Sequence, residues 1–189
     1  MLPSRDDVAM ESLRGHLLLA GAALWDPNFR RSVVLIAHHD DEGAVGVVLN
    51  DRADVRVSEA IPQLGSLVPP DEPLFVGGPV EPRAAVVIAD FEDPSVAEII
   101  ALGTIGLLPP ESDSDVDLGI VRARVFAGYA GWGPGQLEAE MREGSWIVEP
   151  ATPDDVFPSD PSRLWDAVLK RKGSGFDLLR AMPIDPTMN

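Results

Sequence analysis

The chain has 189 residues, 45% of them hydrophobic, no cysteine, and 31 acidic against 15 basic side chains, for a formal net charge of −16. This length and composition predict one globular domain, and the lack of cysteine excludes disulfides, a thiol nucleophile and a zinc–thiolate site. Because so acidic a protein repels the phosphate backbone, we expect no direct DNA binding.

The N-terminal region is expected to carry neither a targeting signal nor a membrane span. It begins MLPSRDD, without a basic region followed by a long apolar stretch, and the longest apolar run, Leu17 to Trp25, is nine residues long. A helix that crosses a bilayer needs about twenty. We therefore predict a cytoplasmic protein without membrane association, in which residues 1–14 form a flexible leader and residues 15–189 a single domain.

The first half of the chain is predicted to be mainly strands. Val33 to Ala37 and Val45 to Leu49 are apolar, β-branched runs, and the turn that ends at Gly43 joins them into a hairpin covered on both faces. Asp26 is expected to cap a single helical turn that begins at Pro27. Further expected elements are a strand at Leu17–Ala20, a short helix at Ser58–Ile61, a strand at Leu74–Val76 with Ala84–Ile88 as its neighbour, and a helix from Asp93 to Gly103.

The second half is predicted to alternate strands and helices. Ile120 to Ala127 alternates apolar and basic residues, which is typical of a strand with one solvent face that carries Arg122 and Arg124. The other expected elements are an acidic surface loop at Pro109–Asp117, a glycine-dense elbow at Gly128–Gly135, a helix at Pro134–Glu143, a strand at Trp146–Val148, and a helix at Asp160–Lys172 whose buried stripe is Leu164, Trp165, Val168 and Leu169.

Common catalytic motifs are missing from the sequence. There is no G-x-S-x-G elbow. The Gly77-Gly78 pair has neither the lysine nor the glycine spacing of a nucleotide-binding loop, so it is a weak signal for a phosphate-binding turn, and the alternative is a sharp structural turn. His38 and His39 are adjacent on a strand, so their side chains point to opposite faces and cannot share a metal. We therefore predict no catalytic residue, no metal and no cofactor.

Polar residues gather at the ends of the predicted central strands. Asp26, Arg31, Ser32 and Asn50 flank the hairpin, and arginine offers a planar fork either to Asp26, as a structural clamp, or to a small anionic ligand. Glycines in the Gly128–Gly135 elbow would let backbone approach a ligand closely. We predict that these segments meet in a cleft, with the clamp as the alternative. The cleft would be lined by Asp26, Arg31, Asn50, Tyr129, Trp132 and Gln136.

Four sequence strings carry a family resemblance. They are DPNFRRSV, the stretch from His39 to Asn50 with the pattern H-x-x-x-G-A-V-G-V-V-L-N, VGGPV, and GYAGWGPGQLEAEM followed by Trp146. Over Gly15 to Pro150 the chain closely resembles the YqgE/AlgH family, and GYAGWGPGQLE is highly specific. The resemblance implies an α+β domain with a curved, barrel-like, largely antiparallel sheet and flanking helices. It also implies a bacterial protein without an established reaction, in a family of which one branch has been described as a transcriptional regulator.

The family pattern covers all of the candidate ligand-binding residues, which are Asp26, Arg31, Ser32, His39, Asn50, Gly77, Gly78, Tyr129, Trp132 and Gln136. Three departures stand out. Asp51-Arg52 replaces the usual lysine-proline, Ala89 replaces a common histidine, and residues 90–118 follow the pattern poorly.

The predicted function is that of a non-enzymatic binding or regulatory protein that acts through a small anionic ligand or a protein partner. One alternative is a hydrolase or transferase that uses Asp26, Arg31, His39 and Asn50. The other is a DNA-binding transcriptional regulator, which the negative charge opposes.

Overall fold

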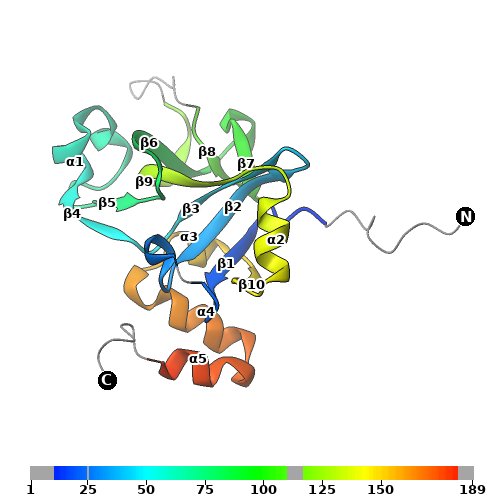
Figure 1. The fold of residues 1–189 in the computed structure, drawn as a ribbon. Helices are drawn as coiled ribbons and strands as arrows, with labels where there is room; N and C mark the ends of the chain where they lie inside the picture. Colours follow the sequence, from blue (N-terminus) through cyan, green and yellow to red (C-terminus); the bar gives the residue numbers. More distant parts are fainter. Residues whose placement is uncertain (1–10, 25, 110–116, 183–189) are drawn as a thin grey trace, which may run out of the picture.

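The computed structural model describes residues 11–24, 26–109 and 117–182 as one α+β domain (Figure 1). Most of the predicted leader, residues 1–10, and most of the predicted acidic loop, residues 110–116, lie outside these ranges. Ser12 and Leu13, at the end of the predicted leader, are hydrogen-bonded to His39. No helix in the described ranges is long and apolar enough to span a membrane.

The sheet is curved and largely antiparallel, as predicted, and it does not close into a barrel. Its strands follow the order β10-β1-β2-β3-β9-β6-β8-β7, with β4 and β5 beside this path and β5 parallel to β9. The described strands are β1 (His16–Ala20), β2 (Val33–Asp40), β3 (Gly43–Val48), β4 (Arg52–Arg56), β5 (Pro73–Val76), β6 (Val80–Phe91), β7 (Ile99–Leu102), β8 (Ile105–Leu107), β9 (Ile120–Trp132) and β10 (Trp146–Pro150).

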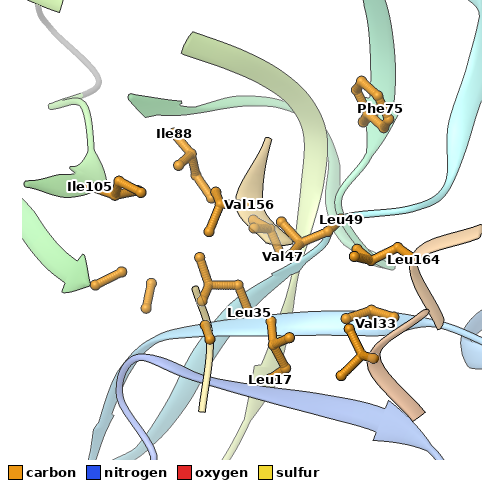
Figure 2. Packing of buried hydrophobic residues seen from close by; sticks show 14 of the residues in the cluster. Leu17, Val33, Leu35, Val47, Leu49, Phe75, Ile88, Ile105, Val156 and Leu164 are labelled. Carbon is orange, nitrogen blue, oxygen red and sulfur yellow. The ribbon is translucent and has the colours of Figure 1, made fainter. Parts of the chain in front are cut away.

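The predicted hairpin is β2 and β3, and it lies at the centre of the core. Three apolar clusters make up the core, and alternate residues of β2 enter two of them. Leu35 belongs to the larger cluster of these two, and Ile36 belongs to the other. The sheet curves around the larger cluster, to which β1, β2, β3 and β6 to β9 all contribute (Figure 2). Both faces of the hairpin are therefore covered, as its continuous apolar pattern predicts.

Short helices cover the sheet and fill its ends. The α-helices are α1 (Val57–Ala60), α2 (Gln136–Arg142), α3 (Pro153–Val156), α4 (Leu164–Lys172) and α5 (Asp177–Ala181). The 3-10 helices are η1 (Pro27–Phe29), η2 (Pro62–Leu67), η3 (Pro94–Val96), η4 (Pro161–Arg163) and η5 (Ser174–Phe176). The predicted stripe of α4 is buried in the larger cluster, which α4 therefore covers.

Two predictions about the middle of the chain are wrong. The strand that contains Ala84–Ile88 is β6, and it pairs with β8 and β9 instead of β5. The helix predicted from Asp93 ends after one turn, at Val96, because β7 and β8 form a hairpin directly behind it. Gly103, the predicted helix stop, lies in the turn of that hairpin with a φ of 57°.

The predicted solvent face and elbow of β9 also need correction. Arg124 is only 8% exposed, because its guanidinium lies over the ring of Phe75 and pairs with Glu72 at 3.1 Å. The predicted elbow begins later than Gly128, because β9 continues to Trp132 and pairs there with β3. Gly128, at a φ of 71°, lies opposite a wide bulge of β6 instead of ending the strand.

Candidate ligand-binding site

A cleft of about 370 Å³ lies between the η1 turn and the start of α2. We call it the tryptophan cleft and define it by seven of its lining residues: Asp26, Phe29, Trp132, Gln136, Glu140, Glu143 and Trp146. Three residues predicted for a shared cleft, Asp26, Trp132 and Gln136, thus come together. Arg31, Asn50 and Tyr129 do not line it.

The first wall of the tryptophan cleft is the η1 turn. Asp26 accepts hydrogen bonds from the backbone N–H and the side-chain amide of Asn28, both at 2.9 Å, so it caps the turn as predicted. Pro27 fits the first helical position because its missing N–H would find no partner there. The turn holds Phe29 in a T-shaped contact with Trp146, at 5.5 Å between ring centroids.

The floor of the cleft is a carboxylate held by two indoles. Glu140 Oε2 accepts hydrogen bonds from Nε1 of Trp132 at 2.9 Å and from Nε1 of Trp146 at 2.7 Å. Glu140 Oε1 accepts one from the Gln136 side chain at 3.1 Å. All three donors are neutral. These bonds join β9, α2 and β10. Within the described chain the Glu140 carboxylate has no ion-pair partner.

The rim of the cleft is acidic as well. Asp26 and Glu143 are exposed at its edge, and none of the described lining residues is a lysine or an arginine. Carboxylates with aromatic neighbours favour a positively charged group over an anion. The predicted anionic ligand stays a prediction, but this lining does not favour it.

Arg31 and Asn50 form a separate structural unit. The Asn50 side chain accepts from Val33 N–H and donates to the Arg31 carbonyl, both at 2.9 Å, and Arg31 has a left-handed φ of 50°. The Arg31 guanidinium lies over the Trp165 ring and donates to the carbonyls of Arg180 and Met182. The predicted Arg31–Asp26 clamp is therefore wrong. The arginine holds the C-terminal helices instead.

His39 lies in a second, smaller cavity of about 250 Å³. Its Nδ1 accepts from Leu13 N–H at 3.0 Å, so the ring proton is on Nε2, which donates to Glu138 at 2.9 Å. Burial alone would raise the pKa of Glu138, but hydrogen bonds from its own backbone N–H and from His39 hold that pKa below its ordinary value. Both ring nitrogens are thus engaged in structural contacts.

The remaining candidates are packed into the fold. Gly77 and Gly78 lie where the chain crosses β9, and a Cβ on either would lie within 2.3 Å of the β9 backbone. They are needed for this close approach, as the sharp-turn interpretation predicts. Ser32 is buried immediately before β2, and Tyr129 packs against the larger cluster. Among the described residues, no three histidines or carboxylates are arranged to hold a metal ion.

The chain matches a known protein family over most of its length. The family DUF179, described as AlgH-like, matches residues 17–177. The chain belongs to this AlgH-like family. A UPF0301 protein of Streptomyces coelicolor is 41% identical over 187 residues, which cover 95% of this chain and 97% of that protein. One of Thermobifida fusca is 42% identical over 193 residues, covering 94% and 96%.

Two solved structures show the same fold. Protein DIP2367 of Corynebacterium diphtheriae, a crystal structure, superposes with a TM-score of 0.79 at 29% identity, covering 91% of this chain and 93% of that one. The solution structure of the AlgH protein from Pseudomonas aeruginosa has a TM-score of 0.68 at 29% identity, covering 97% and 98%. The AlgH-like family consists of uncharacterised proteins, so membership establishes the fold but not the activity. The activity has to be inferred from the geometry of the site.

Two features of the AlgH-like site were overlooked by the predicted residue list. Glu140 and Trp146 complete the indole–carboxylate network, yet the list names neither. The signal was present, because Gln136 and Glu140 are four residues apart on one helix face. Ala89, which replaces a common family histidine, is fully buried between Gly106 of β8 and Ala123 of β9, so this chain has no titratable group there.

Proposed function

We propose that this AlgH-like protein is a non-enzymatic binding protein whose tryptophan cleft takes the positively charged end of a small organic ligand. The observation that carries the proposal is the Glu140 carboxylate, held in place by neutral donors at the floor of an aromatic cleft. A cation would neutralise this charge without breaking the indole bonds, because each carboxylate oxygen can accept more than one hydrogen bond.

The cleft is built to hold an ammonium or guanidinium group instead of a bare metal ion. Asp26 and Glu143 at the rim supply further negative charge, and Phe29 supplies an apolar surface for the ligand's carbon skeleton. Trp132 and Trp146 are 7% and 4% exposed, so they lie under the ligand and lower the local polarity. Ion pairing at a partly buried site of this kind is stronger than in bulk water.

The two alternative functions find less support in the geometry. A hydrolase or transferase was expected to use Asp26, Arg31, His39 and Asn50 together. The Asp26 side chain bonds to Asn28, Asn50 bonds to the backbone at Arg31 and Val33, and His39 bonds to Glu138, so the four side chains serve separate contacts. A DNA-binding role would have to overcome the net charge of −16.

The test is a titration followed by the indole N–H resonances of Trp132 and Trp146. Butylammonium is the probe, and butyrate is its counterpart of similar size and opposite charge. We expect butylammonium to shift both indole resonances and butyrate to shift neither. Glu140→Gln should abolish the shift while the sheet amide pattern remains, because the amide is isosteric and uncharged. Glu59→Gln, an exposed change on α1, is the matched control. Equal shifts with butyrate, or none with either probe, would contradict the proposal.

A further inference from the structure

β9 has one edge that is only partly paired. Along one side it pairs with β6 from Ile120 to Tyr129. On the other side it pairs with β3 near its end and with β5 only at Phe126 and Ala127. In the described chain no strand pairs with the segment Ile120–Arg124 on this second side. This part of β9 is therefore an unpaired strand edge.

The peptide group of Ala123 faces this open edge. The Val87 carbonyl accepts from Leu108 N–H at 2.9 Å, so the peptide groups of Val87 face away from β9. Val87 is opposite Val125, and Ala89 is opposite Ala123. In antiparallel strands, two residues opposite each other either both direct their N–H and C=O groups at the partner strand or both direct them away from it. The peptide groups of Val125 therefore face away from β6, as do those of Ala123, two residues along the strand.

Pro73 explains why β5 stops short of this edge. Phe75 is opposite Phe126, so the next pair along the parallel ladder would be Pro73 and Arg124. Proline has no N–H to donate to the Ala123 carbonyl. Among the described residues, no loop backbone bonds to Ala123 either. The residue is 7% exposed, and peptide groups this buried are rarely left without a partner.

A cavity of about 420 Å³ lies directly against this edge. We call it the β9 groove and define it by Leu67, Val68, Glu72, Arg122, Ala123 and Phe157, which line it. Leu67 and Val68 bring apolar surface from η2 and its following loop, and Phe157 closes the other side. The groove therefore combines free backbone hydrogen-bonding groups with apolar walls.

Arg122 gives the groove a charge preference. Its guanidinium carbon lies over the Phe157 ring, 4.4 Å from the centroid, and its Nε pairs with Asp90 at 3.3 Å. Its two terminal amines have no hydrogen-bond partner among the described residues. Arg124 is different, because its Nε and both of its terminal amines are bonded. Arg122 thus presents an oriented pair of donors of the kind that binds a carboxylate.

We propose that the β9 groove binds an extended peptide segment of a partner protein, which adds to β9 as a further strand and places an acidic side chain on Arg122. The peptide backbone would pair with the N–H and the carbonyl of Ala123, and alternate side chains would contact Leu67, Val68 and Phe157. This surface is separate from the tryptophan cleft, and the inference does not depend on the function proposed for that cleft.

The test uses two blocked pentapeptides as probes, one alternating valine with glutamate and one alternating valine with lysine. We expect the glutamate peptide to shift the Ala123 amide resonance and slow its hydrogen exchange, and the lysine peptide to bind more weakly. Arg122→Gln should weaken binding of the glutamate peptide about fivefold, the value of an ion pair worth about 1 kcal/mol. Arg83→Gln, an exposed arginine in the β6 bulge, is the matched control and should have no effect.

A second variant tests the backbone contact. Ala123→Pro removes the N–H that faces the groove, and it should abolish binding of both peptides. An edge strand tolerates proline at a position whose N–H faces away from the sheet. Should this variant fail to fold, the comparison of Arg122→Gln with Arg83→Gln still decides. The proposal fails if neither peptide perturbs the Ala123 amide of the unmodified protein, or if the two arginine variants weaken binding equally.

Discussion

Asn50 connects the end of β3 to the bend that starts β2. Its amide oxygen accepts from Val33 N–H, and its amide nitrogen donates to the carbonyl of Arg31, the residue with a left-handed φ. Among the described residues, neither of these backbone groups has another hydrogen-bond partner. An asparagine supplies the acceptor and the donor at once, which a carboxylate or a hydrocarbon cannot do.

Asn50→Ala should therefore destabilise the protein by roughly 1–3 kcal/mol, the usual result of leaving partly buried hydrogen-bonding groups unpaired. Asn28→Ala is the matched control, because it removes an asparagine of the same turn region whose contacts are exposed. It should change the free energy of unfolding by less than about 0.5 kcal/mol. Urea denaturation of both variants measures the difference. Equal effects would show that the Asn50 bridge is not stabilising.

The sequence allowed the polar residues of the site to be found, and it did not allow their partners to be chosen. Asp26 caps its own turn, which local spacing predicts. The clamp alternative paired Arg31 with Asp26, five residues away, yet Arg31 contacts carbonyls 149 and 151 residues along the chain. Such partners depend on how the C-terminal helices pack, and no spacing rule reports that.

At the level of elements, the predictions succeeded where the signal is local. The β2–β3 hairpin and α4 are set by apolar runs, a turn and a helical stripe, each within about fifteen residues. β7 and β8, with four and three residues, are too short to show a period, and a nearby Asp-Pro pair suggested a helix instead. The pairing of β5 with β9 joins residues some fifty apart, which a single sequence does not encode visibly.

The C-terminal helix α5 should depend on Arg31 for its position. It has five residues, too few to be stable alone, and its Leu178 is 81% exposed. Its other ties to the domain are Leu179, which packs against the larger cluster, and Arg180, which pairs with Asp166 of α4. Arg31 donates to the carbonyls of Arg180 and Met182 at the end of this helix. Arg31→Ala should therefore lower the hydrogen-exchange protection of α5 while the amides of the sheet stay protected.

Arg30→Ala is the control for this change, because Arg30 is the neighbouring arginine and its side chain is exposed. Arg31→Gly gives a second comparison, since it removes the same guanidinium and also relieves the left-handed backbone, which costs a non-glycine residue of order 1 kcal/mol or more. Hydrogen exchange followed by mass spectrometry reports both regions at once. Loss of protection throughout the sheet in Arg31→Ala would instead make Arg31 part of the core.

At the scale of the whole molecule, β9 connects the two proposed binding surfaces. Its 13 residues run from the β9 groove, at Arg122 and Ala123, to the tryptophan cleft at Trp132. At about 3.3 Å per residue, the two surfaces lie roughly 30 Å apart along the strand. A small ligand and a peptide could therefore occupy the protein together without contact between them.

The net charge of −16 decides the last prediction, that the isolated protein binds no specific duplex DNA. Protein–DNA affinity comes largely from basic side chains that displace counterions from phosphates, and here 31 acidic residues outnumber 15 basic ones. Several of the arginines are also engaged internally, including Arg124 with Glu72, Arg171 with Asp155 and Arg180 with Asp166. These pairs leave little positive surface to place against a groove.

Fluorescence anisotropy with labelled duplexes of random and of chosen sequence, at about 150 mM salt, provides the measurement. Non-specific binding by ordinary DNA-binding proteins has a Kd of roughly 10⁻⁴ to 10⁻⁶ M under such conditions, and we expect this protein to bind more weakly than that. Lowering the salt should not rescue binding, because repulsion between like charges grows as screening falls. Sub-micromolar, sequence-dependent binding would contradict the prediction, since it would require a basic surface that outweighs the acidic body of the molecule.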